Sequence, residues 1–210
     1  GDWEYDDSED KLINYDAILA AFENETAVLG DMYITADIAR YGKDKTVIML
    51  WNGLRVQQIV TMDVNSVTEA ANKIKELQLR YSIPLANICV DEDGIGGGVK
   101  DILRCKGFVN NSKPLKGENY ANLKTQCYYT LADRVNKSMI YIQTENIQTQ
   151  NLIVQELEQV RRKNFDKDGK LQLIGKDEVK TSIGGSPDYS DALMMRMIYE
   201  LKATGKYYVQ

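Results

Sequence analysis

The sequence predicts an α/β fold built on one mixed sheet, with three antiparallel strands first, parallel strands after them, and helices on its flanks. Two observations predict it. Apolar, strand-like runs fill residues 32–61 and are joined by the hairpin signal Asn52-Gly53. A helical pattern at 66–81 then leads to the short apolar run Ile88-Cys89-Val90, which a crossover would place beside the first strand and parallel to it.

The remaining elements follow from shorter signals. The glycines after Asp91 predict a turn into a short helix. Residues 165–174 contain the turn signal Asp168-Gly169 and predict a second hairpin. Ser186 and Pro187 predict the N-cap and first position of a closing helix that reaches about residue 203. Between these we expect strands at 107–109 and 139–142 and helices at 120–135, 150–162 and 176–183.

The composition indicates one globular domain. The 210 residues are 43% hydrophobic, 9% aromatic and 27% charged, enough for a core of ordinary size. The net charge of -5 argues against binding nucleic acid through bulk charge alone, although it leaves room for a local basic groove. The three cysteines form no CxxC pair and predict reduced thiols. No stretch nears the ~20 apolar residues that cross a bilayer, so we expect a soluble, unsecreted protein.

Three acidic residues stand where a fold could gather them. Asp37 and Asp91 come at the polar ends of apolar, strand-like runs, and Asp191 lies near the start of the closing helix. Three carboxylates at one point repel one another unless cations neutralise them. The chain has no histidine and no thiol pair at metal-ligand spacing, so oxygen ligands remain, and these suit Mg²⁺ or Mn²⁺. Taken alone, Asp37 or Asp91 could simply end a strand.

The order of the predicted elements is that of the ribonuclease H-like fold, and three motifs resemble the C-terminal nuclease domain of the large terminase subunit of tailed bacteriophages. That protein translocates and cuts DNA during packaging. The motifs are a first-strand Asp followed by Ala and Gly (Asp37 to Gly42), a Val-Asp-x-x-Gly-x-Gly (Val90 to Gly96) and a Ser-Pro-Asp-x-x-Asp-Ala-Leu (Ser186 to Leu193). The resemblance covers residues 31–203, and the combination of motifs is specific.

The resemblance implies a metal-dependent endonuclease that cuts double-stranded DNA with little sequence specificity during phage genome packaging. Asp37, Asp91 and Asp191 would be its catalytic residues and the ligands of two Mg²⁺ or Mn²⁺ ions. Phosphodiester cleavage needs an activated water, a neutralised transition state and a stabilised leaving oxygen, which two cations ~3.5–4 Å apart supply together. Two alternatives stay open: a fragment of a phosphotransferase related to actin and the sugar kinases, and a catalytically idle DNA-binding or assembly module.

Asp188 is where the sequence departs from that family. Many members carry a histidine three positions before the last Asp, and this chain has Asp188 there. At this spacing its carboxylate lies on the same helix face as Asp191 and could ligate the second metal ion. It could equally complement only the dipole of the closing helix, a surface effect of ~0.3–1 kcal/mol. For Asp93 we expect a turn residue that bonds to its own backbone.

Basic side chains around the acidic motifs are candidates for contacts with DNA phosphates. Most lysines are simply solvated, but a set that flanks an acidic centre could position phosphates without reading the sequence. The candidates are Arg40, Lys43, Lys45, Arg161, Arg162, Lys163, Lys176 and Lys180.

The acidic, irregular start of the chain predicts a lead-in or linker over residues 1–30, which the resemblance would derive from an upstream ATPase module. Gly1 in place of an initiator Met supports a fragment of a longer chain. Residues 31–204 would form the nuclease domain and residues 205–210 a C-terminal tail. No GxxxxGK[ST] motif occurs, so the motor would lie outside this chain. The resemblance also implies the ATPase motor domain, the small terminase subunit and the portal protein as partners, in the cytoplasm of an infected bacterium.

Overall fold

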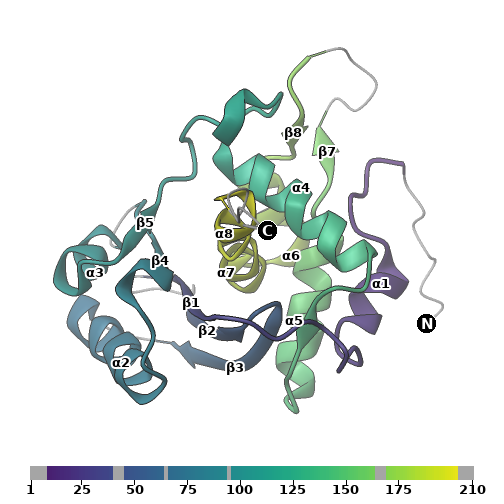
Figure 1. The fold of residues 1–210 in the computed structure, drawn as a ribbon. Helices are drawn as coiled ribbons and strands as arrows, with labels where there is room; N and C mark the ends of the chain where they lie inside the picture. The colour runs from purple at the N-terminus through teal and green to yellow at the C-terminus, as the bar shows by residue number, and fades with distance from the viewer. Residues whose placement is uncertain (1–8, 40–44, 64–65, 94–95, 164–168, 203–210) are drawn as a thin grey trace, which may run out of the picture.

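A six-stranded mixed sheet forms the middle layer of the computed structural model, which describes residues 9–39, 45–63, 66–93, 96–163 and 169–202 (Figure 1). The strand order is β5-β4-β1-β2-β3-β6. Strands β1, β2 and β3 pair antiparallel, whereas β4 runs parallel to β1, β5 to β4 and β6 to β3. Their bounds are β1 Met32–Asp37, β2 Thr46–Asn52, β3 Arg55–Met62, β4 Ile88–Asp91, β5 Lys106–Phe108 and β6 Tyr141–Ile142. The predicted fold class is confirmed.

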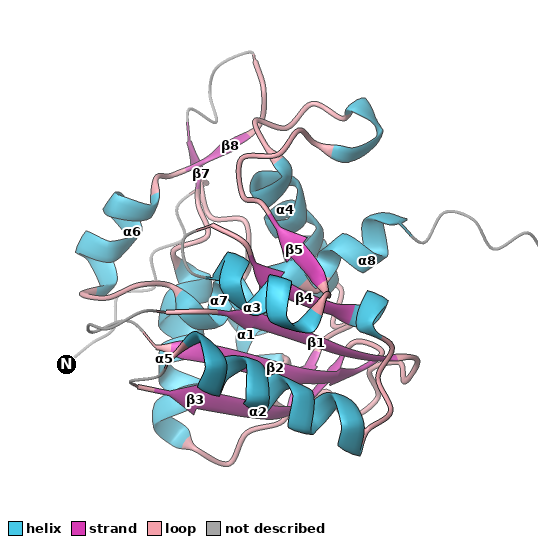
Figure 2. Ribbon diagram, turned by 90° about the vertical axis from the view of Figure 1, so that its left-hand side faces the viewer, coloured by secondary structure: helices cyan, strands magenta, loops and turns pink. Residues whose placement is uncertain are grey.

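Helices cover both faces of this sheet (Figures 1 and 2). One face carries α2 (Val67–Arg80) and α3 (Gly96–Leu103). The other carries α1 (Tyr15–Ala20), α4 (Leu123–Asn136), α5 (Ile147–Glu158), α7 (Asp188–Met195) and α8 (Met197–Lys202). The remaining elements are α6 (Lys176–Ile183), the small hairpin of β7 (Arg162–Lys163) and β8 (Gln172–Leu173), and the short 3-10 helices Leu85–Asn87 and Leu115–Gly117. In the described residues no helix has the length and apolar character needed to cross a bilayer.

Side-chain alternation along β1 divides the interior into two cores. Ile34 and Ala36 pack on the side of α2 and α3. Thr35 points the other way, and its hydroxyl accepts a 3.0 Å hydrogen bond from Nε1 of Trp51, which belongs to the core under α4, α7 and α8. Because successive side chains of a strand face opposite sides, Asp37 shares the side of Thr35.

The predicted hairpin at Asn52-Gly53 is confirmed, and so is the start of the helix predicted from residue 66. Gly53 takes φ 61° in the hairpin between β2 and β3, and a Cβ there would lie 2.3 Å from the Val28 carbonyl oxygen. Ser66 caps α2 in a capping box: its hydroxyl accepts from the Glu69 N–H at 3.2 Å, and the Glu69 carboxylate accepts from the Ser66 N–H at 2.7 Å. The three cysteines are free, as expected.

The closing helix differs from its prediction in its N-cap and in an interruption at Arg196. Pro187, not Ser186, is the N-cap residue, and α7 begins at Asp188. The helix is also interrupted at Arg196, where backbone hydrogen bonds change to the three-residue spacing. The buried Arg196 guanidinium donates to the Gly53 carbonyl from Nε at 3.1 Å and Nη2 at 2.8 Å. This long-range contact fixes the break against the β2–β3 turn.

The helix predicted at 150–162 is wrong in its bounds. It begins at Ile147, because the Asn146 side chain accepts from the N–H groups of Gln148 and Thr149 and so caps it. It ends at Glu158, and Arg162 pairs instead in the β7–β8 hairpin. The turn Asp168-Gly169 expected in that hairpin lies partly outside the described residues.

The described part of the expected lead-in packs against the rest of the fold. Ile18 of α1 is fully buried and Ile13 nearly so, in the core that contains α4 and α5. The Leu12 N–H donates to the Val160 carbonyl at 3.0 Å, and the Arg162 N–H donates to the Asp10 carbonyl at 2.7 Å. Residues 10–22 therefore contribute to the stability of this unit.

Ile18→Ala should lower the free energy of unfolding by about 2–5 kcal/mol, because it leaves a cavity in the core. Leu19→Ala on the same helix is the matched control, since Leu19 is 38% exposed, and it should change stability by less than about 0.5 kcal/mol. Urea unfolding followed by circular dichroism measures both. Equal values for the two variants would mean that α1 is not integrated into the core.

Candidate metal centre

Asp37 and Asp91 lie side by side at the carboxyl ends of two neighbouring parallel strands. The β1–β4 register pairs Ala36 with Val90, so the next residue along each strand is an aspartate. Ala36 and Val90 both face the core under α2 and α3. Alternation therefore turns both carboxylates toward the opposite face, where α7 packs on β1.

Helix α7 brings two more carboxylates to the same place. Asp188 and Asp191 occupy its first turn and are 7% and 6% exposed. Asp188 Oδ2 accepts a 2.8 Å hydrogen bond from the Lys45 N–H, which ties the helix to the segment just before β2. Asp188 is thus buried and engaged, and it is not a surface complement to the helix dipole.

The buried carboxylates repel one another strongly. Burial, together with the charges of Asp191 and Asp188, raises the pKa of Asp37 well above its ordinary value, while Lys176 opposes the shift. Burial also raises the pKa of Asp91 to about 6, against the lowering effect of the Asp93 N–H. Without a bound cation, the cluster therefore favours proton uptake near neutral pH.

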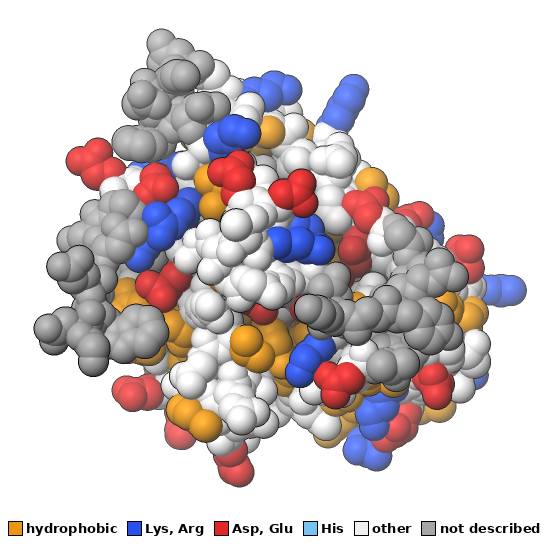
Figure 3. Space-filling model, turned by 180° about the vertical axis from the view of Figure 1, so that it is seen from behind, with side chains coloured by type: hydrophobic (Ala, Val, Ile, Leu, Met, Phe, Trp, Pro, Cys, Tyr) orange, Lys and Arg blue, Asp and Glu red, His pale blue; other side chains and the backbone are white. Residues whose placement is uncertain are grey.

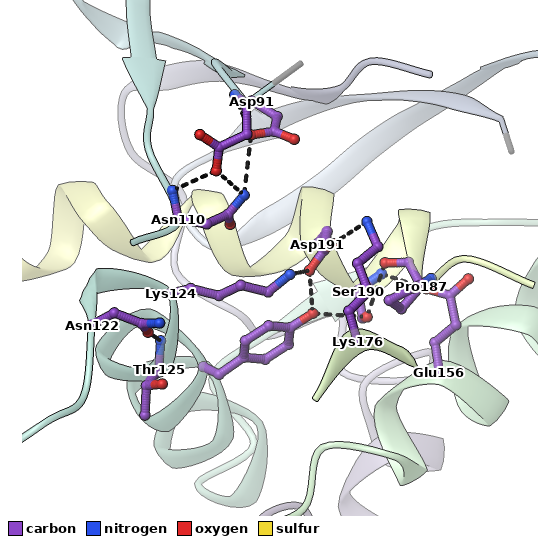
Figure 4. A network of polar contacts seen from close by, with 12 residues as sticks. Asp91, Asn110, Asn122, Lys124, Thr125, Glu156, Lys176, Pro187, Ser190 and Asp191 are labelled. Carbon is purple, nitrogen blue, oxygen red and sulfur yellow. Dashed lines mark hydrogen bonds and ion pairs between the residues drawn. The ribbon is translucent and has the colours of Figure 1, made fainter. Parts of the chain in front are cut away.

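Two ammonium groups counter the charge of Asp191 (Figure 4). Lys124 Nζ of α4 lies 2.7 Å from Asp191 Oδ1, and Lys176 Nζ of α6 lies 3.7 Å from Oδ2. The Tyr128 hydroxyl donates to Oδ1 at 2.7 Å. Burial alone would raise the pKa of Asp191, but the two lysines and these hydrogen bonds outweigh it and lower the pKa.

Asp91 is held from the adjacent strand end. Asn110, just beyond β5, donates from Nδ2 to Asp91 Oδ1 at 3.3 Å and to Asp93 Oδ2 at 2.7 Å (Figure 4). Asp93 lies in a turn, as expected, and its carboxylate also accepts from the Asn110 N–H, while Asp91 accepts from the Asp93 N–H. The expected bond of Asp93 to its own backbone two residues on would involve residue 95, which lies outside the described residues. The sequence signal for Asn110 was available, since a polar residue follows a short apolar strand there as well.

Gly96 allows the chain to return close to Asp91. A Cβ at this position would lie 1.6 Å from the Asp91 carbonyl oxygen, so no other residue fits without moving the strand end. Gly96, the first residue of α3, therefore serves close backbone approach at the site, while residues 94–95 of the expected glycine turn lie outside the described residues.

The carboxylates gather at one place, but in the described residues no three acidic or thiol side chains form a group that could hold a metal ion as they lie. Three of the four are turned to protein partners: Asp191 to Lys124 and Tyr128, Asp91 to Asn110, and Asp188 to the Lys45 N–H. Their chemistry nevertheless fits a hard divalent cation, because the donors are carboxylates on one apolar-backed surface. Burial first, and acidic neighbours second, raise the pKa of Asp37 and of Asp91, which a bound cation would oppose.

Glu156 is an acid of the site that no sequence signal indicated. It lies on α5, is 4% exposed, and its Oε2 accepts a 2.7 Å hydrogen bond from the Ser190 N–H. Burial raises its pKa well above the ordinary value, partly offset by that hydrogen bond and reinforced by Asp188 and Asp191.

A cavity of about 400 Å³ opens beside the acids. Its wall includes Lys124, Tyr128, Glu156, Lys176 and Ser190, together with amide side chains from the start of α4 and the loop after β5. The cavity gives a polar ligand access to the lysines that pair with Asp191.

The basic candidates for DNA contact fall into separate groups. Lys176 lies at the acids, and Lys45 Nζ pairs with Asp63 at 3.2 Å. Arg161 and Arg162 contact the lead-in, through Asp10 Oδ1 at 3.7 Å and the Glu9 carbonyl respectively. On the face seen in Figure 3, the drawn Lys and Arg side chains are interspersed with Asp and Glu. Lys163 is exposed on β7, Lys180 lies on α6, and Arg40 and Lys43 fall outside the described residues.

Comparison by sequence gives nothing: no protein-family model matches this chain, and no curated protein matches it. Comparison by structure is informative. The nuclease domain of the large terminase subunit gp2 of bacterial virus Sf6 superposes with a TM-score of 0.76, at 23% identity, over 89% of this chain and 98% of that domain. The chain has the fold of a terminase nuclease domain.

Two more distant domains share this terminase-nuclease fold. The large terminase nuclease from thermophilic phage G20c gives a TM-score of 0.57 at 14% identity, over 90% of this chain and 98% of that one. The nuclease domain from Thermus phage P74-26 gives 0.56 at 14% identity, over 95% and 99%. The ribonuclease H-like, terminase-nuclease fold expected from the motifs is therefore confirmed.

Asp37→Asn should stabilise the protein in the presence of a chelator at pH 8. The raised pKa of Asp37 means that its ionised form disfavours the folded state, so wild-type stability is lost as pH rises through that pKa. Asparagine cannot ionise, so the variant does not lose stability in this way. The melting temperatures of the variant and the wild type should therefore converge below the ordinary carboxyl pKa, near pH 3–4. Thermal unfolding at several pH values measures the difference.

Glu145→Gln, in an exposed loop, is the control that removes one acidic charge away from the cluster. It should leave the melting temperature within about 1–2 °C of the wild type. Equal melting temperatures for Asp37→Asn and the wild type at pH 8 would contradict the repulsion inferred for the cluster.

Proposed function

We propose that this protein is a divalent-metal-dependent endonuclease that cuts double-stranded DNA with little sequence specificity during phage genome packaging. The observation that carries the proposal is a cluster of four acids at the carboxyl ends of β1 and β4 in a terminase-nuclease fold, in which Asp37, Asp188 and Asp191 are buried and Asp91 is half-buried. Such burial is unfavourable for stability, and a bound cation would relieve it. A protein retains an arrangement of this kind where the chemistry needs it.

The structural neighbours support divalent metal dependence. A mutant of the Sf6 nuclease domain was solved with manganese, and the G20c nuclease was solved with magnesium and with cobalt. We infer the same class of cofactor here, Mg²⁺ or Mn²⁺, with Asp37, Asp91 and Asp191 as the ligands of two ions and Asp188 as a further ligand.

When bound, the two cations would supply an activated water and neutralise the negative charge of the phosphodiester transition state. The chain itself supplies the rest. The β1 and β4 strand ends fix Asp37 and Asp91 through sheet register, and Asn110 holds the Asp91 carboxylate by a hydrogen bond. Lys124 and Lys176 place positive charge at the cavity wall, where a backbone phosphate can reach it.

DNA recognition would rest on the phosphate backbone, which is why little sequence specificity is expected. Lys176 is the candidate closest to the acids, and the cavity wall adds Lys124, which the sequence did not single out. The remaining proposed contacts are Arg40, Lys43, Lys45, Arg161, Arg162, Lys163 and Lys180.

The packaging context is part of the proposal. We infer that residues 31–204 are the cutting unit of a packaging motor, that the described lead-in packs on this unit, and that an ATPase module precedes it. The ATPase motor domain, the small terminase subunit and the portal protein would be its partners, in the cytoplasm of the infected host.

Plasmid nicking tests the proposed activity. The wild type should convert supercoiled DNA to nicked and linear forms in Mn²⁺ or Mg²⁺ and do nothing in chelator. Asp91→Ala should lower the rate by about 100-fold or more, because it removes a group that supports transition-state charge stabilisation. Glu145→Gln should cut as the wild type does.

Two results would overturn the proposal. One is a folded wild-type protein that cuts in neither metal at several concentrations, which would favour the idle binding module. The other is an Asp91→Ala variant that cuts as fast as the wild type.

A further inference from the structure

We propose that Glu156 is a positioning residue: its carboxyl oxygen caps the first turn of α7 from a separate helix and so fixes where Asp191 and Asp188 lie. The inference rests on the proposed nuclease function and adds a residue to that site. Glu156 and Ser190 are 34 positions apart in the chain, yet Oε2 lies 2.7 Å from the Ser190 nitrogen.

Helix α7 needs such an acceptor. The first N–H groups of a helix have no partner within it, and a side chain at the N-cap usually accepts one of them. The N-cap of α7 is Pro187, and among the described residues no N-cap side-chain hydrogen bond is present there. Glu156 accepts a hydrogen bond from the N–H of Ser190, the third helical residue, and so takes the place of the missing N-cap side chain.

The capped turn is connected directly to the acidic cluster (Figure 4). The Ser190 hydroxyl lies 3.0 Å from the Tyr128 hydroxyl, which donates to Asp191 Oδ1 at 2.7 Å. The Ser190 hydroxyl also donates to the Pro187 carbonyl at 3.2 Å. A shift of Ser190 therefore displaces the backbone of Asp191 and the hydrogen bond that orients its carboxylate.

Packing alone does not explain an acid at this position. Glu156 is 4% exposed, and its helix neighbours Ile153 and Leu157 are fully buried and apolar. A buried carboxyl costs free energy unless it is hydrogen-bonded, and here Asp188 and Asp191 make its ionised form still less favourable. The pairing with an otherwise unpaired helix N–H offsets that cost.

The acceptor oxygen, and not the charge, carries the effect. Glu156→Gln keeps a carbonyl oxygen at the same distance from the backbone, whereas Glu156→Met keeps the length of the side chain but has no acceptor. Because Glu156 also lines the cavity, a direct contact with substrate or metal is the competing explanation. That explanation requires the carboxylate itself, so it expects Gln to be as impaired as Met.

The experiment compares the wild type, Glu156→Gln and Glu156→Met in the full chain, with Gln155→Ala on the exposed side of the same helix as matched control. Hydrogen–deuterium exchange follows the amides of the first turn of α7. Calorimetry measures Mn²⁺ affinity, and plasmid nicking gives kcat and KM.

We expect Glu156→Met to exchange the Ser190 amide about 10-fold faster or more. We also expect it to bind Mn²⁺ about 10-fold more weakly. Its kcat should fall about 10- to 100-fold with KM little changed, as misplacement of a reacting group does. Glu156→Gln and Gln155→Ala should stay within about threefold of the wild type in every readout.

Equal impairment of Gln and Met would overturn the proposal, as would a Met variant that matches the wild type in exchange and kcat. If the Met variant is unfolded by circular dichroism, exchange in Glu156→Gln decides: wild-type protection at Ser190 supports the role of the acceptor, and its loss contradicts it. Exchange and Mn²⁺ affinity do not require cleavage, so a wild type that fails to cut would reject the proposed function and leave this test standing.

Discussion

Electrostatic repulsion among three buried aspartates, Asp37, Asp188 and Asp191, and the half-buried Asp91 explains how the elements around them are arranged. Parallel pairing of β1 with β4 places Asp37 next to Asp91, and α7 adds Asp188 and Asp191 from above the same face. Ionised carboxylates so close together and so little exposed disfavour folding unless opposite charge or hydrogen-bond donors compensate them. The elements around the cluster supply these compensating groups.

The compensation is divided among elements that are distant in the chain. Lys124 of α4 and Lys176 of α6 face Asp191, and the backbone N–H before β2 serves Asp188. Lys176 opposes the shift of Asp37, yet burial, reinforced by Asp191 and Asp188, still raises the pKa of Asp37 well above its ordinary value. A fold that buries a carboxylate among other acids in this way is prepared for a cation.

Local signals predicted the sheet and the three acids, because the features concerned are set by neighbours in sequence. The Asn52-Gly53 turn, the apolar runs and the polar residues that end β1 and β4 are of this kind. The contacts that complete the site join residues that are far apart in the chain, so no local signal predicts them. Glu156 meets Ser190 across two helices, Lys124 reaches Asp191 from α4, and Arg196, at the break in the closing helix, binds the Gly53 carbonyl. Each depends on tertiary packing that no periodicity encodes.

The most direct test of the central claim is a crystal structure of the wild-type chain grown with Mn²⁺, with anomalous diffraction used to locate the metal. We expect manganese density bounded by the carboxylates of Asp37, Asp91 and Asp191, with Lys124 turned away from Asp191. Saturating Mn²⁺ that leaves this place empty, with the Lys124–Asp191 ion pair intact, would contradict the claim that this acidic cluster holds a cation.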